Sequence, residues 1–166
     1  MEVKIKAGIF VNKTSEVYSK EEKKNLTAQF WDNFTLYCAT IAASPEKSKR
    51  WLLRNTKVKD VHLKFEPDRE STKVILEIVH RDEDKRLEQY EKIEQYKCIL
   101  EEGFPNGLVW DFAYIRDTGQ HVCRIYTEKK GHDWYRQSQW KEIFEFMAVN
   151  MALLENNFIE IRDLIR

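Results

Sequence analysis

The last part of the chain has apolar residues at a regular helical spacing, and this pattern limits the fold more than any other feature. Eight apolar residues from Trp140 to Ile165 follow one another at intervals of four and three. The mean interval of 3.5 residues is typical of a helix that buries one narrow stripe along its length. The pattern therefore predicts a long helix over residues 137–165.

The stripe leaves two alternatives for what the helix packs against. It lies across a sheet of the same chain, or part of it pairs with a second copy and forms a homo-oligomer. In the second alternative, the contact is made by the C-terminal part of the stripe. The candidate interface residues are Met151, Leu154, Phe158, Ile161 and Ile165.

The preceding residues alternate between helical and strand-like patterns. A capping box from Ser19 to Glu22 predicts a helix that ends near Ala43, and Ser44-Pro45 starts a short helix with Trp51. Residues 61–80 and 108–127 read as two hairpins, and residues 82–102 as a charged helix. The order is helix, two strands, helix, two strands, helix.

This order predicts an α+β fold in which helices pack on a four-stranded, mainly antiparallel sheet and the C-terminal helix is long. We expect residues 19–166 to form a single domain, preceded by a strand or an arm over residues 1–18.

The alternation within each hairpin also predicts which side chains share a face. Pairing Val61 with Leu76 and Leu63 with Val74 places the apolar residues of the first hairpin on one side. In the second hairpin, the residues expected on one face are Leu108, Trp110, Phe112 and Tyr114.

Three charged residues interrupt the apolar strands and form a candidate polar cluster. Glu77, Asp111 and Arg124 each stand between apolar neighbours on their own strand face. A buried charge is costly unless it is paired, so we expect the three to meet on the sheet face opposite the main core. They form a structural ion-pair network or, alternatively, two carboxylates that bind a divalent cation or do acid/base work.

A basic stretch is the second candidate site. The chain has 28 basic and 28 acidic residues, which excludes a strongly basic, histone-like binder but allows a local patch. A nucleic-acid strand is bound by cations that contact its phosphates and by aromatic rings on which its bases stack, and this stretch has both. In the alternative interpretation, the acidic helix 82–102 neutralises the cations of this stretch. The candidate nucleic-acid-binding residues are Lys47, Lys49, Arg50, Trp51, Arg54, Lys57, Lys59 and Lys64.

Other site patterns are weak. Pro67-Asp68 and Glu77 resemble part of a nuclease motif, but Val79 replaces its lysine, and Asp68 is more than about 20 Å from Glu77 along the hairpin. No histidine pair has zinc-site spacing, and no glycine loop for phosphate is present. We therefore expect no catalytic residue, no metal site and no cofactor. We expect the three cysteines to be buried as small apolar residues. We also expect no membrane partner and a cytoplasmic location.

Several short motifs together resemble a known family. They are Tyr18-Ser19-Lys20-Glu21-Glu22, Phe30-Trp31, Phe34, Tyr37, Trp51, Leu76-Glu77-Ile78-Val79-His80, Trp110, Asp117, Gly119, Arg124-Ile125-Tyr126 and Trp140. Over residues 18–166, their order and spacing resemble a bacterial family described as domain of unknown function 4268. Where its pattern suggests Lys-Thr-Gly-Ile-Lys, this chain has Asn55-Thr56-Lys57-Val58-Lys59 and so lacks the glycine.

The resemblance implies no specific activity. It implies a domain that occurs alone or at the C-terminus of longer, sometimes nuclease-like proteins, and hence a nucleic-acid or defence context. From the residues, we expect a non-enzymatic binding or assembly module that is homo-oligomeric. The alternatives are a nucleic-acid-binding accessory domain that uses residues 47–64 and a degenerate metal-dependent nuclease or hydrolase.

Overall fold

The computed structural model describes residues 17–41 and 55–166. The predicted short helix with Trp51, and the predicted strand or arm except for Val17 and Tyr18, lie outside these ranges. The elements are α2 (Lys20–Ile41), β1 (Val61–Pro67), β2 (Ser71–Ile78), α4 (Glu83–Glu94), α5 (Lys97–Leu100), β3 (Val109–Ile115), β4 (His121–Lys130), η1 (Gln137–Gln139), α6 (Trp140–Ile161) and η2 (Arg162–Leu164).

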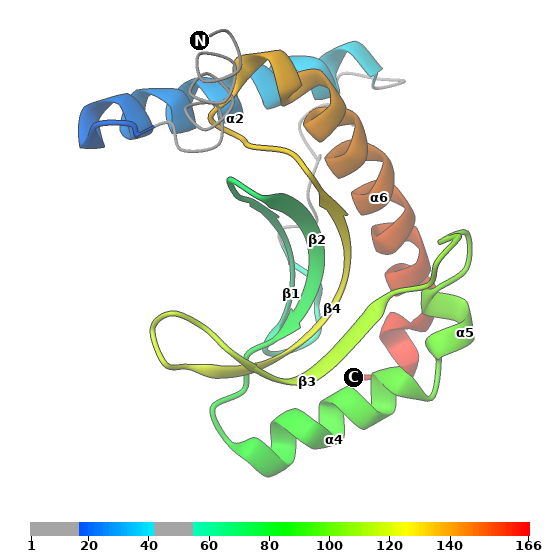
Figure 1. Cartoon of the computed structure of the whole chain (residues 1–166). Coiled ribbons are helices and arrows are strands. Elements are labelled where there is room, and N and C mark those ends of the chain that lie inside the picture. The colour runs from blue at the N-terminus through cyan, green and yellow to red at the C-terminus, as the bar shows by residue number, and fades with distance from the viewer. Residues whose placement is uncertain (1–16, 42–54) are drawn as a thin grey trace, which may run out of the picture.

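The four described strands form one antiparallel sheet in the order β1-β2-β4-β3. Figure 1 shows that the sheet is curved, with α6 along its convex side and α2 across the start of α6. The concave side has no described helix on it; we call it the open face. The structure thus confirms the predicted α+β fold with an antiparallel sheet and a long C-terminal helix.

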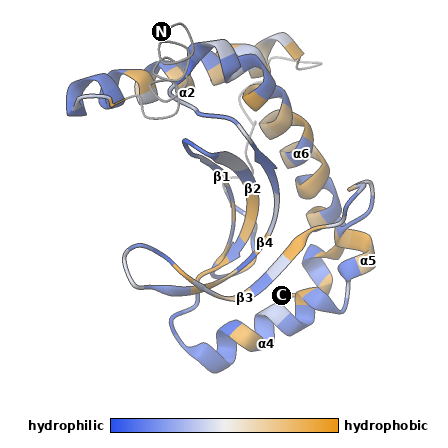
Figure 2. Cartoon of the chain, viewed as in Figure 1, coloured by the Kyte–Doolittle hydropathy of each residue, from blue (hydrophilic) through white to orange (hydrophobic). Residues whose placement is uncertain are grey.

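The apolar stripe of α6 packs inside the chain itself. Met151, Leu154, Phe158, Ile161 and Ile165 are at most 1% exposed and share a core with the convex face of the sheet. An interface between copies needs side chains that solvent can reach, so these five candidate residues are core residues in this fold. In Figure 2, α6 is accordingly more hydrophobic than α4.

A second core joins the N-terminal half of α6 to α2. Phe30, Phe34 and Cys38 of α2 are buried against Trp140 and Phe144 of α6. The predicted capping box at the start of α2 is confirmed, because the Glu22 N–H donates to Ser19 Oγ and the Ser19 N–H donates to the Glu22 carboxylate.

The predicted register of the first hairpin is wrong by two residues. Val61 pairs with Ile78 and Leu63 with Leu76, and the pairing continues to Pro67. The turn lies one residue later than expected, because the Asp68 N–H donates to the Ser71 carbonyl. A shift of two residues keeps every side chain on its expected face.

Two other details differ from expectation. A bulge between Asp111 and Tyr114 shifts the register, so Trp110 lies beside Ile125 of the core whereas Tyr114 pairs with Val122 on the open face. The predicted common face of the second hairpin is therefore wrong. The charged helix is also interrupted, since Tyr96 leaves helical geometry with φ −106° and ψ 24° before α5 begins.

Candidate functional site

The three candidate polar residues lie in one row across the sheet. Glu77 of β2 pairs in register with Arg124 of β4, and Arg124 pairs with Asp111 of β3. The Nε of Arg124 donates to Oε2 of Glu77 at 2.8 Å, and both side chains are buried. The backbone register itself thus brings this carboxylate and this guanidinium together.

Glu77 and Arg124 belong to a larger ion-pair network on the open face. The two terminal nitrogens of Arg124 donate to the Glu66 carboxylate at 3.0 and 2.9 Å. Arg116, just after β3, donates to the other oxygen of Glu77. The Nζ of Lys64 lies 3.5 Å from Oε2 of Glu66 and 3.7 Å from Oε2 of Glu77. Each buried charge of this network therefore has a partner of opposite sign.

The network extends across β2 to β4 and includes two tyrosines. The Nζ of Lys73 lies 3.9 Å from Oε1 of Glu66 and 3.7 Å from Oε2 of Glu128. The guanidinium of Arg124 lies 3.8 Å from the ring centre of Tyr114, and the Lys73 ammonium lies 5.3 Å from that of Tyr126. We define the floor of the open face by its charged residues and tyrosines. They are Lys64, Glu66, Lys73, Glu77, Tyr114, Arg116, Arg124, Tyr126 and Glu128.

The pKa values of two members reflect this pairing. Burial would raise the pKa of Glu66, but its hydrogen bonds with Arg124 and the charges of Arg124, Lys64 and Lys73 lower it overall. Burial would lower the pKa of Arg124, but the hydrogen bonds and charges of Glu66 and Glu77 raise it overall. Both groups are held in their charged forms.

Asp111 does not join the network, although it is in the same row. Its Oδ1 accepts from the Ala113 N–H, and no hydrogen bond or ion pair links it to Arg124 or Glu77 in the described part of the chain. The bulge after Asp111 gives the carboxylate this local partner. The expected cluster therefore forms between Glu77 and Arg124 without Asp111.

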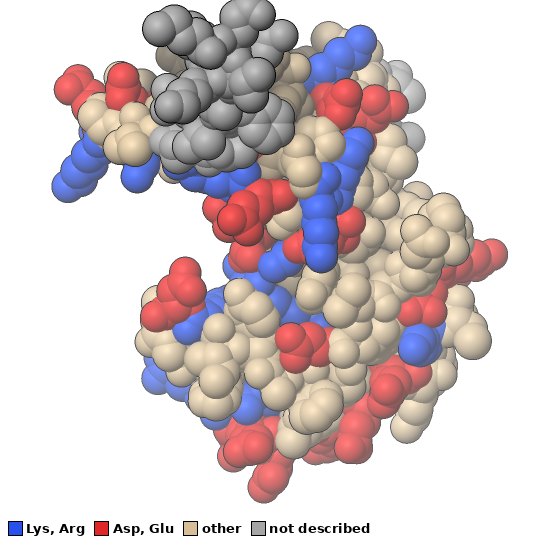
Figure 3. Space-filling model, viewed as in Figure 1, with Lys and Arg blue, Asp and Glu red and all other residues tan. Residues whose placement is uncertain are grey.

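Six floor residues were not predicted from the sequence as site residues: Glu66, Lys73, Tyr114, Arg116, Tyr126 and Glu128. Glu66 and Lys64 are two residues apart on β1, so they share the face of Glu77, and this spacing was an available signal. Arg116 lies outside the strands, so only the curvature of the hairpin brings it to Glu77. Figure 3 shows that this side of the molecule is hollowed and that basic and acidic side chains mix there.

The basic stretch is only partly described. Lys47, Lys49, Arg50, Trp51 and Arg54 lie outside the described residues. Lys57 and Lys59 are exposed in the loop before β1, and Lys64 is part of the floor of the open face. Lys64 is thus neutralised by Glu66 and Glu77 of the sheet rather than by the acidic helix.

The loop before β1 keeps the backbone form that a glycine would favour. Lys57 has φ +61°, in the left-handed region. The buried hydroxyl of Thr56 donates to carbonyls of Val58 and Val61 and accepts from the Val58 N–H, which holds the loop in place. Lys57 is the position where the resemblance described above leads us to expect a glycine.

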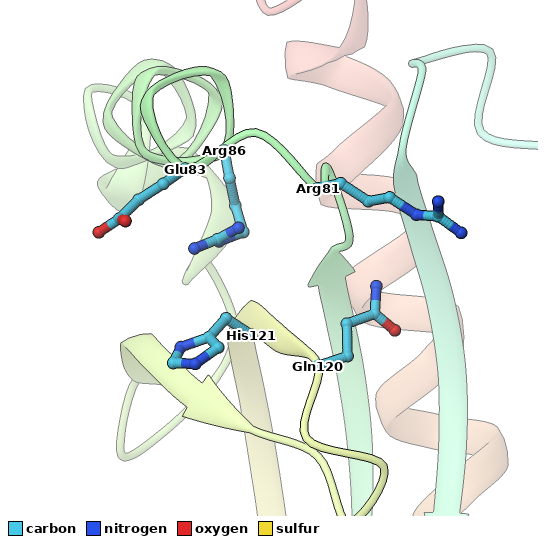
Figure 4. Close-up of a pocket in the computed structure, with 5 residues that line it drawn as sticks. All are labelled: Arg81, Glu83, Arg86, Gln120 and His121. Atoms are coloured by element: carbon cyan, nitrogen blue, oxygen red, sulfur yellow. The ribbon is translucent and has the colours of Figure 1, made fainter.

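A separate pocket of about 540 Å³ lies between the start of α4 and the start of β4. Its lining residues are Arg81, Glu83, Arg86, Gln120 and His121. Figure 4 shows the Arg86 guanidinium and the His121 ring turned toward the same space, with Glu83 and Arg81 extending away on either side. Arg86 and His121 were not among the candidates from the sequence.

Two kinds of feature were not found in residues 17–41 and 55–166. No group of three or more His, Cys, Asp or Glu residues there is arranged to hold a metal ion. No helix in these ranges combines the length and the apolar character needed to cross a membrane.

Comparisons with known proteins agree with this architecture only at the level of the family. No curated protein and no solved structure matches the chain. Residues 26–162 match the family model described as Domain of unknown function (DUF4268), and this range includes the whole sheet and all buried residues of both cores except Ile165. The chain therefore belongs to the DUF4268 family.

Proposed function

We propose that this domain is a non-enzymatic binding module whose open face binds single-stranded nucleic acid. The observation that supports this most is the composition of the floor, where four cations stand beside three carboxylates and two tyrosines. Cations that follow a phosphate backbone, together with aromatic rings on which bases stack, are the usual means of binding single strands.

The exposed side chains of the floor carry one more positive than negative charge. Glu77 and Arg124 are 1% and 3% exposed and cancel, whereas Lys64, Arg116 and Lys73 are 33%, 29% and 20% exposed beside Glu66 and Glu128 at 32% and 20%. A ligand would therefore meet three cations and two carboxylates, the same excess of one positive charge that the residue count gives. The buried ion pairs fix the positions of these cations before binding, which lowers the entropic cost of ordering them.

The chemistry of the same residues argues against catalysis at this face. Each carboxylate oxygen of Glu77 accepts a hydrogen bond from a guanidinium group, so this residue is not a free general base. Away from this face, Cys38 and Cys123 belong to the two cores, and burial raises the pKa values of their thiols to about 11, which disfavours the reactive thiolate. The free thiols of Cys38, Cys98 and Cys123 support a reducing, cytoplasmic location as part of this proposal.

A salt-titrated binding assay with labelled single-stranded DNA and RNA tests the proposal. We expect saturable binding at low salt and a logarithmic salt slope of about −0.7 for each phosphate that the protein neutralises. Lys64→Ala and Lys73→Ala should each weaken binding and make the slope shallower. Lys92→Ala removes a lysine that pairs with Glu88 on α4, so it is the matched control and should change neither.

Undetectable binding of both nucleic acids at low salt would exclude this function. Equal losses in Lys64→Ala, Lys73→Ala and Lys92→Ala would show that binding depends on total charge and not on the open face.

The edge strand β3 supports assembly as a second candidate function. Val109, Phe112 and Ile115 of this edge strand are exposed, with Phe112 at 59%. The opposite edge, β1, contains Lys64 and Pro67, which are typical of edges protected from pairing. We propose that β3 pairs antiparallel with β3 of a second copy, so that the exposed apolar residues of one copy lie beside those of the other across a twofold axis.

Light scattering on the pure protein at high micromolar concentration tests this assembly. We expect a dimer that Phe112→Lys converts to a monomer. Val149 is also 59% exposed but lies on α6, so Val149→Lys is the control and should leave the dimer intact. A wild-type monomer would rule out pairing through β3.

A further inference from the structure

The two buried arginines among the described residues differ in their surroundings. Arg124 has carboxylate partners from two strands, as described above. Arg86 is only 6% exposed, yet no carboxylate of residues 17–41 and 55–166 forms an ion pair with it. One terminal nitrogen donates to the His80 carbonyl at 2.9 Å, and the side chain is also hydrogen-bonded with the Cys123 thiol. Its Nε has no hydrogen-bond partner among the described residues. A guanidinium cannot lose its charge, so a buried one without a counter-charge is unfavourable.

The place of Arg86 in the fold indicates where a counter-charge would come from. It lies in the first turns of α4 and lines the pocket of about 540 Å³ that α4 forms with the start of β4. Its guanidinium and the ring of His121 face the same space from opposite walls (Figure 4). Both groups donate hydrogen bonds to oxyanions, and Arg binds two oxygens at once.

The acidic residues nearby do not fill this space. Glu83 extends away from the gap between Arg86 and His121 in Figure 4. The Asp82 carboxylate accepts from the Lys85 N–H at 3.0 Å as the N-cap of α4. That backbone hydrogen bond is the largest of the causes that lower the pKa of Asp82. The Asp82 carboxylate therefore interacts with the start of α4 and not with Arg86.

We propose that this pocket binds a small ligand through an oxyanion, a phosphate or a carboxylate group, with Arg86 as the principal partner. His121 supplies the second contact from β4. The amide of Gln120 closes the wall beside it, since its Nε2 lies within hydrogen-bond distance of the Val79 carbonyl. The volume lies within the range of about 300–1,000 Å³ found for small-molecule sites. This site is separate from the nucleic-acid surface proposed above and does not depend on it.

Calorimetric titration at low salt with inorganic phosphate and, separately, with malonate tests the site. We expect saturable binding of at least one probe, and the stronger probe identifies the preferred oxyanion. Arg86→Met should weaken binding about tenfold or more, because it removes a charge-assisted hydrogen-bonding group. His121→Ala should weaken it several-fold.

Arg166→Ala is the matched control, because Arg166 is an exposed arginine that pairs with Asp163 at the C-terminus. It should bind the probes as the wild type does. Absence of saturable binding with both probes overturns the proposal, and so does wild-type affinity in Arg86→Met. Should Arg86→Met fail to fold, His121→Ala decides, because His121 is exposed at the first position of β4. Unchanged affinity in that variant is then the overturning result.

Discussion

Glu77 and Arg124 are register partners on neighbouring strands, and their side chains meet at 2.8 Å with at most 3% of either exposed. Desolvating such a pair costs several kcal/mol, so a buried ion pair persists only where further hydrogen bonds complete it. The Glu66 carboxylate accepts a further hydrogen bond from Arg124, and Arg116 donates a further hydrogen bond to Glu77. We infer that the pair chiefly fixes how β2 aligns with β4.

Glu77→Gln should destabilise the domain by about 3 kcal/mol, because it leaves buried cations without their carboxylate. Urea unfolding at neutral pH measures this loss. Glu128→Gln affects a partly exposed pair with Lys73 and should cost no more than about 1 kcal/mol. Similar losses in the two variants would contradict the structural role assigned to Glu77.

Glu66 should contribute to acid sensitivity. Its pKa is lowered in the folded protein, as argued above, so it adds stability above its unfolded pKa, and this is lost as the pH falls through the folded value. Glu66→Gln should lose about 1 kcal/mol at pH 7, and the difference from wild type should shrink in acid. Unfolding curves at both pH values check this. A constant difference would disprove the linkage.

Lys57→Gly should stabilise the domain by about 0.5–1 kcal/mol. It removes the strain of a left-handed backbone at φ +61°, which outweighs the greater freedom of glycine in the unfolded chain. Lys59→Gly is the control in the same loop and should not stabilise, since Lys59 does not have positive φ. Thermal unfolding distinguishes the two.

One thiol of the three should react readily with a thiol reagent in the native protein. Cys98 is exposed on α5, contrary to the expectation that all three cysteines are buried, whereas Cys38 and Cys123 are buried. Burial also raises the pKa values of Cys38 and Cys123 to about 11, which slows thiolate formation. Cys98→Ser should abolish the fast reaction, and a remaining fast thiol would contradict the described burial.

The stripe of α6 can be tested at two adjacent residues. Phe158 is fully buried, and Phe158→Ala should cost about 3–5 kcal/mol, whereas Ile159 is 41% exposed and Ile159→Ala should cost much less. Chemical unfolding measures both. The loss in Phe158→Ala should not depend on protein concentration, because its contacts lie within one chain.

The sequence predicted α6 well because a repeat sustained from Trp140 to Ile165 is compatible with only one kind of element. It could not choose between a sheet of the same chain and a second copy, since both bury the same stripe. The first hairpin shows a similar limit. Alternation defines the faces of β1 and β2, but pairings that differ by two residues, such as Val61 with Leu76 or Ile78, satisfy it equally.

The candidate site was predictable in its centre and not at its edges. Glu77 and Arg124 stand out because charge is rare among apolar strand neighbours. Asp111 has the same local pattern, but its hydrogen bond to the Ala113 N–H accompanies a bulge that alternation does not reveal. Arg116 contacts Glu77 only because the hairpin bends, and such bending depends on the whole sheet.

The single helix α6 serves two cores, one with α2 and one with the sheet, and Phe65 of β1 packs against both. Cooperative unfolding therefore need not be uniform. The lobe built on Phe30 and Phe34 can open as its own unit while the sheet stays closed on the second half of α6. Amide hydrogen exchange would then divide the molecule into a faster class in α2 and a slower class in β2 and β4.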